Sequence, residues 1–228
     1  LSVLGFGTGN IKDNKMEALA DKGNGNYAYI DSMMEAKKVL VNEMGGTLVT
    51  IAKDVKIQVE FNPSKVKEYR LVGYDNRILR NEDFDDDAKD AGEIGAGHNV
   101  IAFYERVPYK DGEPVEKTEL KYQSSDIRQE WEHEWMEIRL RYKEPDKDTS
   151  KKITCTIMEQ DITKNPSENY LFASAVVEFG LLLRDSQYKG DSSWENVKAR
   201  AGKSIGEDAE EYRSSFMKLA GTAESLLR

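Results

Sequence analysis

The sequence predicts an α+β protein built from three successive segments, because its hydrophobic period changes twice along the chain. Residues 1–46 alternate short strands with helices, which is the pattern of a partial α/β unit. Residues 47–160 alternate apolar and polar positions, as the strands of an antiparallel β-sandwich do. Residues 161–228 place apolar residues at helical spacing and predict a helical segment of three helices.

The first segment is predicted to form a strand, a helix, a second strand and a second helix, in that order. An apolar stretch from Leu1 to Gly7 and residues 27–30 predict the two strands, and Asp13 is expected to cap the helix between them. The pair Gly45-Gly46 is expected to end the second helix. Two strands joined by a helix are expected to pair in parallel through a right-handed crossover.

A parallel sheet has both faces covered, and two strands cannot form such a sheet alone. We therefore expect residues 1–46 to be the end of a larger α/β domain whose body precedes Leu1. An unpaired apolar strand tends to pair with another chain. The stretch from Leu1 to Gly7 is thus expected either to self-associate or to pair with an upstream polypeptide.

In the middle segment, apolar and polar residues alternate, as they do in strands that have one face exposed to water. Its predicted strands cover residues 55–61, 69–72, 100–104, 118–122, 136–142 and 153–158. Turns rich in Gly, Pro and Asp separate them, which favours the sandwich.

The last segment contains two helix start signals. Asn165 is expected to cap the first helix, with Pro166 at its first helical position. Ser192 and Glu195 have the spacing of a capping box before the second helix, and Gly206 separates the third.

Composition excludes several classes of function. The chain has 228 residues and a formal net charge of −9, and this acidic balance argues against a nucleic-acid or anionic-membrane partner, because both need a basic surface. Its apolar runs are all shorter than the roughly 18 to 20 residues of a membrane span, so no membrane-spanning segment is expected. One Cys and two His exclude an internal disulfide framework and a His-rich zinc site.

The turn from Gly5 to Asn10 follows a strand and precedes a helix, which is the setting of a dinucleotide-binding fingerprint. Asn10 stands where the third glycine of that fingerprint belongs. We therefore favour a tight strand-to-helix turn over nucleotide binding.

An acidic stretch from Asp83 to Asp90 gives Asp83, Asp85 and Asp87 the spacing of the first ligands of a calcium loop. Ala88 replaces the turn glycine, and Ile94 stands where the bidentate Glu belongs. We expect a solvated acidic loop, and leave calcium binding open.

The stretch from Trp131 to Trp135 interleaves aromatic, acidic and imidazole side chains. No second His follows His133 at zinc-protease spacing, so we expect Trp131, His133 and Trp135 to pack on one strand face. A catalytic or pH-sensing His133 is the alternative.

Two further residues have reactive side chains. Cys155 alternates with Ile153 and Ile157, and is expected to be a small buried apolar residue rather than a nucleophile. His98 follows a glycine-rich turn and is expected to fix that turn by hydrogen bonding.

Several long runs resemble bacterial von Willebrand factor type A proteins of the YfbK-like group. The matching runs are residues 4–7, 19–31, 52–63, 69–74 and 90–98. The similarity covers nearly the whole chain, is dense through about residue 105, and becomes weaker toward the helical end.

This resemblance implies that residues 1–46 are the last strands and helices of a type A domain, and that the remainder is the group's C-terminal extension. The metal-ion-dependent adhesion site of such domains begins with an Asp-x-Ser-x-Ser pentad, which this sequence lacks. A divalent cation, Mg or Ca, is therefore expected only in the intact domain, where Thr8, Gly9 and Asn10 would at most line the rim of the site. Members of the group resemble lipoproteins of the cell envelope.

We accordingly expect a non-enzymatic interaction or scaffold module with an unidentified protein partner. No catalytic, cofactor-binding or metal-binding residue is expected in this chain. The alternative is a hydrolase or nucleotide-binding enzyme that uses the turn from Gly5 to Asn10 or the strand from Trp131 to Trp135.

Overall fold

The computed structural model describes residues 1–7, 9, 11–23, 25–75, 77–110, 112–115 and 131–227. Its helices and antiparallel sheets confirm the predicted α+β class. The chain divides into two compact units, Leu1–Asp161 and Ile162–Arg228. No helix in the described part of the chain is both long and apolar enough to span a bilayer.

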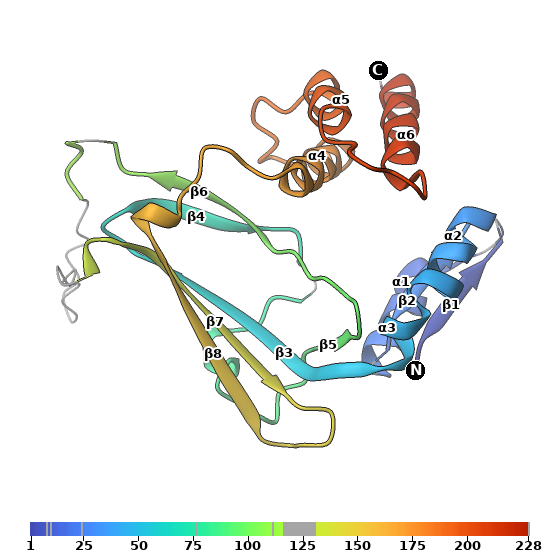
Figure 1. The fold of residues 1–228 in the computed structure, drawn as a ribbon, viewed down its shortest axis with the longest axis horizontal. Helices are drawn as coiled ribbons and strands as arrows, with labels where there is room; N and C mark the ends of the chain where they lie inside the picture. Colours follow the sequence, from blue (N-terminus) through green and yellow to red (C-terminus); the bar gives the residue numbers. More distant parts are fainter. Residues whose placement is uncertain are drawn as a thin grey trace. The chain divides into compact units, whose positions relative to one another are not determined.

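A two-stranded parallel sheet opens the first unit (Figure 1). Strand β1 (Val3–Phe6) pairs with β2 (Tyr27–Ile30), and helix α1 (Asp13–Lys22) connects them, which confirms the predicted parallel pairing. The predicted cap at Asp13 is wrong, because Asp13 is already helical and Lys12 precedes it as the N-cap residue. Ala20 of α1 is fully buried, and the end of the Met16 side chain lies against Gly5. The small residues of this segment therefore let α1 approach the sheet closely.

A run of helical segments follows β2. Ser32 accepts a hydrogen bond from the backbone N–H of Glu35 and caps α2 (Met33–Lys37), which continues as the π-helical turn η1 (Lys38–Asn42) and then α3 (Met44–Leu48). The prediction that Gly45-Gly46 ends the helix is wrong, because both glycines lie inside α3. Neither has the positive φ of a helix-ending glycine.

Two antiparallel sheets form the middle of the first unit. The larger has the order β5-β3-β7-β8, in which β3 spans Thr50–Phe61, β5 Gly92–Gly95, β7 Glu134–Lys143 and β8 Ser150–Met158. The smaller pairs β4 (Val66–Val72) with β6 (Phe103–Pro108). Short 3-10 turns η2 (Asn81–Asp83) and η4 (Glu159–Asp161) follow β4 and β8. The predicted strand at residues 118–122 lies outside the described residues.

An aromatic cluster joins these two sheets. The ring of Phe61 on β3 lies 4.5 Å from that of Tyr69 and 5.6 Å from that of Tyr104. Beside it, the guanidinium of Arg106 lies 4.1 Å from the ring centroid of Trp135. Burial of Phe61, which is 7% exposed, thus concentrates the core of this unit at one end of the larger sheet.

Three helices form the second unit: α4 (Glu168–Leu183), α5 (Trp194–Gly202) and α6 (Tyr212–Leu227). Their core is built on Phe179, Val197 and Ala220, with Trp194 and Phe216 packed against it. The Phe179 ring meets those of Trp194 and Phe216 edge-on at 5.7 and 5.3 Å.

The helix starts of this unit differ from the prediction. Ser167 caps α4 by accepting the N–H of Tyr170, so neither Asn165 nor Pro166 has its predicted position. Ser193, not Ser192, caps α5 and accepts the N–H of Asn196. A serine one residue along satisfies the same free N–H groups, and sequence spacing alone could not choose between neighbours.

Candidate functional site

Apolar side chains cover one face of the larger sheet. Because side chains alternate along a strand, opposed residues of β3, β7 and β8 form rows on that face. The rows are Ile57–Leu140–Ile153, Val59–Ile138–Cys155 and Phe61–Met136–Ile157. We call these nine residues the apolar face.

The apolar face is covered at one end and open at the other. Phe61 is buried by the aromatic cluster, whereas Ile57 and Ile153 of the opposite row are 43% and 51% exposed. Cys155 is exposed as well, so its predicted burial is wrong. The reason is that, among the described residues, no second layer covers the apolar face at Cys155, which lies on the outermost strand of the described sheet.

Basic residues occupy the opposite face of the same strands, and the acidic loop binds there. Lys56 is only 3% exposed, and its Nζ donates to the backbone carbonyls of Asp83, at 3.1 Å, and Asp86. Arg141 pairs with Asp85 at 2.7 Å and Asp87 at 3.1 Å. The loop is therefore fixed to the sheet.

The three carboxylates with calcium-loop spacing each have a basic partner. Arg80 forms two hydrogen bonds of 3.0 Å to Asp83, which is 7% exposed. Asp83 is thus not the solvated residue that the sequence predicted. The hydrogen bond from Arg80 lowers the pKa of Asp83, and a hydrogen bond from Ser150 is the main cause that lowers the pKa of Asp87.

A second acidic group forms where β5 pairs with β3. One carboxylate oxygen from each of Asp54, Asp90 and Glu93 lies within 4.8 Å of the other two. Asp54 has a φ of 49° at the irregularity in the pairing of β3. The Nζ of Lys143 contacts its Oδ2 at 2.6 Å, and the N–H of Ala91 donates to its Oδ1.

Burial and mutual repulsion divide the charge within this group. Burial raises the pKa of Asp90, and its hydrogen bond to Asp54 raises it further. Burial also raises the pKa of Glu93, helped by the charges of Asp54 and Asp90. Burial opposes ionisation of Asp54 too, but hydrogen bonds from Lys143 and Ala91 outweigh it and lower its pKa.

Three clustered carboxylates are ligands of the kind that hard cations prefer. Here the Lys143 ammonium already supplies positive charge to one of them. Sequence reasoning missed this group, because Asp54 lies on β3 whereas Asp90 precedes β5 and Glu93 lies on it, and only the pairing of β3 with β5 brings them together.

The other predicted candidates do not form a joint site. Trp131 and His133 precede β7 and are exposed, whereas Trp135 packs under Arg106; the predicted one-face packing of the three is wrong. The His98 ring fills the space beside Gly46, and its backbone N–H donates to Gly95. In the turn from Gly5, Gly7 has a φ of 88°, while Thr8 and Asn10 lie outside the described residues.

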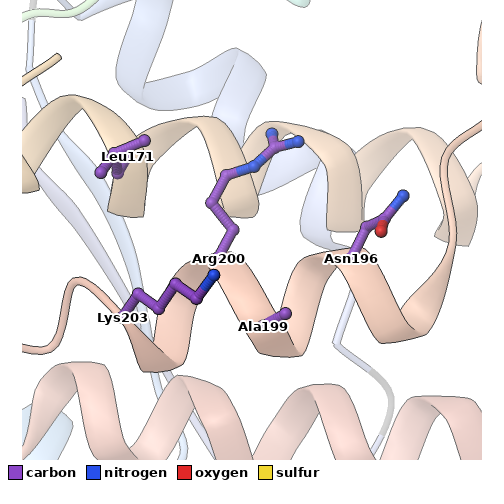
Figure 2. Close-up of a pocket in the computed structure, with 5 residues that line it drawn as sticks. All are labelled: Leu171, Asn196, Ala199, Arg200 and Lys203. Atoms are coloured by element: carbon purple, nitrogen blue, oxygen red, sulfur yellow. The ribbon is translucent and has the colours of Figure 1, made fainter. Parts of the chain in front are cut away.

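An open depression of about 290 Å³ lies between α4 and α5 of the helical unit (Figure 2). It is lined by Leu171, Asn196, Ala199, Arg200 and Lys203. The Arg200 side chain extends toward α4, where it donates to Ser174 at 3.3 Å and pairs with Glu178 at 3.3 Å. Its charge therefore serves the contact between the two helices.

By fold, this is an α+β protein with small antiparallel sheets and a separate helical unit. The family described as "Uncharacterized protein YfbK, C-terminal" matches residues 46–226, and the chain belongs to this family. It is 37% identical over 226 residues to the uncharacterized protein YfbK of Escherichia coli (strain K12). The match covers 99% of this chain and 39% of that relative, so the chain spans well under half of the relative's length. No solved structure matches the chain.

Proposed function

We propose that this chain is a non-enzymatic protein-interaction module of the YfbK family, and that the open end of the apolar face carries the interaction. The observation behind the proposal is the row Ile57–Leu140–Ile153, in which the side chains of Ile57 and Ile153 are half exposed. Contiguous exposed apolar surface is typical of a binding surface, because its removal from water stabilises a complex.

The charged face supports the same proposal. Lys56, Arg141 and Lys143 all contact the loop that contains Asp83, Asp85 and Asp87. Their charges stabilise the fold and are not free to act on a substrate. Within the described part of the chain, the apolar face has no such cover at its open end.

The resemblance adds a context for this module. We propose that residues 1–46 end a von Willebrand factor type A domain, and that a divalent cation binds only in the intact domain. The parallel pair β1–β2 supports this, because parallel sheets normally have more strands and are covered on both faces. A cell-envelope location, as a lipoprotein, belongs to the same proposal and rests on the resemblance alone.

Photo-cross-linking from single positions tests the interaction. A photoreactive amino acid replaces Ile153 on the apolar face or, as a matched control, its neighbour Thr154 on the opposite face of β8. In cells that make the full-length protein, we expect position 153 to give a discrete cross-link to a different protein that position 154 does not give. Absence of that product from position 153, or an equal amount of it from both positions, would contradict the proposal.

A further inference from the structure

The outer edge of β8 offers backbone groups for pairing with another strand. In the order β5-β3-β7-β8 it is the last described strand, and Figure 1 shows it on the outer side of β7. All five residues from Lys151 to Cys155 are exposed. An edge of this length whose N–H and C=O groups face water is a template for strand addition.

We propose that a second copy of this chain pairs antiparallel along β8, with the two-fold axis at Cys155. This inference goes beyond the proposed function, because it concerns the edge of the same sheet and not its apolar face. Two four-stranded sheets would then join into one of eight strands, and the two apolar faces would become continuous.

The side chains of β8 select this register. With the axis at Cys155, Ile153 lies opposite Ile157 of the other copy and Thr154 lies opposite Thr156. Apolar residues therefore face apolar ones, and hydroxyls face hydroxyls, which favours an antiparallel pair. An axis at Ile153 would instead place Lys151 opposite Cys155 on the apolar face.

Charge complementarity at the ends of the strand supports the same choice. Lysines on an edge normally discourage pairing. In the Cys155-centred register, however, Lys151 lies opposite Glu159, just beyond the strand. Within one copy Lys151 already pairs with Glu144 and Glu159 with Lys65, so the contact between the copies would extend these two ion pairs. Each copy has both Lys151 and Glu159, so this contact forms twice in the dimer.

The alternative edge is weaker. β1 has four residues, whereas β8 has nine. Self-association through the stretch from Leu1 to Gly7 stays a separate prediction of the sequence, and a longer ladder of backbone hydrogen bonds favours β8.

Cys155 is the only cysteine of the chain and reports directly on the register. Residues opposite each other in an antiparallel pair have Cα atoms roughly 4.5 to 5.5 Å apart, within the range of about 4.4 to 6.8 Å that a disulfide spans. Mild oxidation with copper phenanthroline, which accepts the two electrons while the two thiols lose their protons, should cross-link the dimer.

The experiment uses the purified full chain. We expect sedimentation equilibrium to show a monomer–dimer equilibrium and non-reducing electrophoresis to show a covalent dimer through Cys155. Two further variants in the Cys155→Ser background, Ile153→Cys and Ile157→Cys, should cross-link when mixed but not alone. Ile153→Lys should raise the dimer dissociation constant at least tenfold.

A matched control separates pairing from collision of exposed thiols. Thr154→Cys in the Cys155→Ser background places the thiol on the opposite face and out of register, so it should cross-link at least tenfold more slowly. Equal rates at positions 154 and 155, or a strict monomer at every concentration, would overturn the pairing. A monomer that still cross-links to a different protein from position 153 would overturn the pairing and leave the proposed function in place.

Discussion

The backbone of Gly46 fills the space in which Gly95 would carry a side chain. A Cβ on Gly95 would come within 1.6 Å of the Gly46 carbonyl oxygen, so α3 and β5 approach each other through two glycines. Gly95→Ala should therefore lower the free energy of unfolding by about 1–3 kcal/mol, the usual cost of overpacking. Gly92→Ala is the control, because nothing lies within 4 Å of its Cβ. Equal effects of the two substitutions in urea denaturation would contradict this packing.

The cap of α5 gives a second matched pair. Ser193→Ala should cost about 0.5–2 kcal/mol, because its hydroxyl accepts the N–H of Asn196. Ser192→Ala should change the stability of the helical unit by much less. Thermal unfolding followed by circular dichroism measures both variants, and a larger loss at Ser192 would show that the cap is misassigned.

Within the acidic group, Asp90 and Asp54 make the stability of the fold depend on pH in opposite directions. Asp90 has a raised pKa, so the folded state holds a proton that the unfolded state has lost, and stability falls as pH rises through the range between the two pKa values. Asp54 has a lowered pKa, so its contribution is present above its ordinary pKa and is lost as pH falls through the folded value.

At pH 7 we therefore expect Asp90→Asn to raise the melting temperature, because it removes the repulsion between two carboxylates and its amide supplies a hydrogen-bond donor toward Asp54. Asp54→Asn should lower stability by about 1 kcal/mol, because Lys143 loses its charged partner. At a pH below both folded pKa values the two effects should disappear. Melting curves across pH check this, and stabilisation by Asp54→Asn at pH 7 would refute the assignment.

The acidic loop depends on one buried lysine. Lys56→Met keeps much of the side-chain volume but leaves the carbonyls of Asp83 and Asp86 without their donor. We expect a loss of about 1–3 kcal/mol and faster amide hydrogen exchange in residues 83–87. Exchange in β8 should stay unchanged. Loop exchange equal to that of the wild type would show that the loop does not depend on Lys56.

Much of the fold could be predicted from the sequence, because the local pattern of apolar and polar residues determines where most helices and strands form. Alternation in residues 136–142 predicted β7, and helical spacing predicted α4 and α6. Gly45-Gly46 misled the prediction because glycine also serves close packing, here against His98. Cys155 was predicted to be buried because alternation shows which face a residue occupies, and not whether another layer covers that face.

The candidate sites were harder to predict, because they depend on pairing between distant strands. Asp54 and Glu93 meet through the register of β3 with β5, which no local pattern specifies. The open end of the apolar face depends on how far the β4–β6 sheet reaches over it. Both are properties of tertiary structure.

The most direct test of an interaction through the apolar face is the alkylation rate of Cys155. In the isolated chain at high dilution, N-ethylmaleimide should modify this exposed thiol rapidly. In intact cells that make the full-length protein, the account predicts a rate at least tenfold lower, measured by mass spectrometry of the β8 peptide, because a partner covers the face. Equal rates in the two settings would contradict the account.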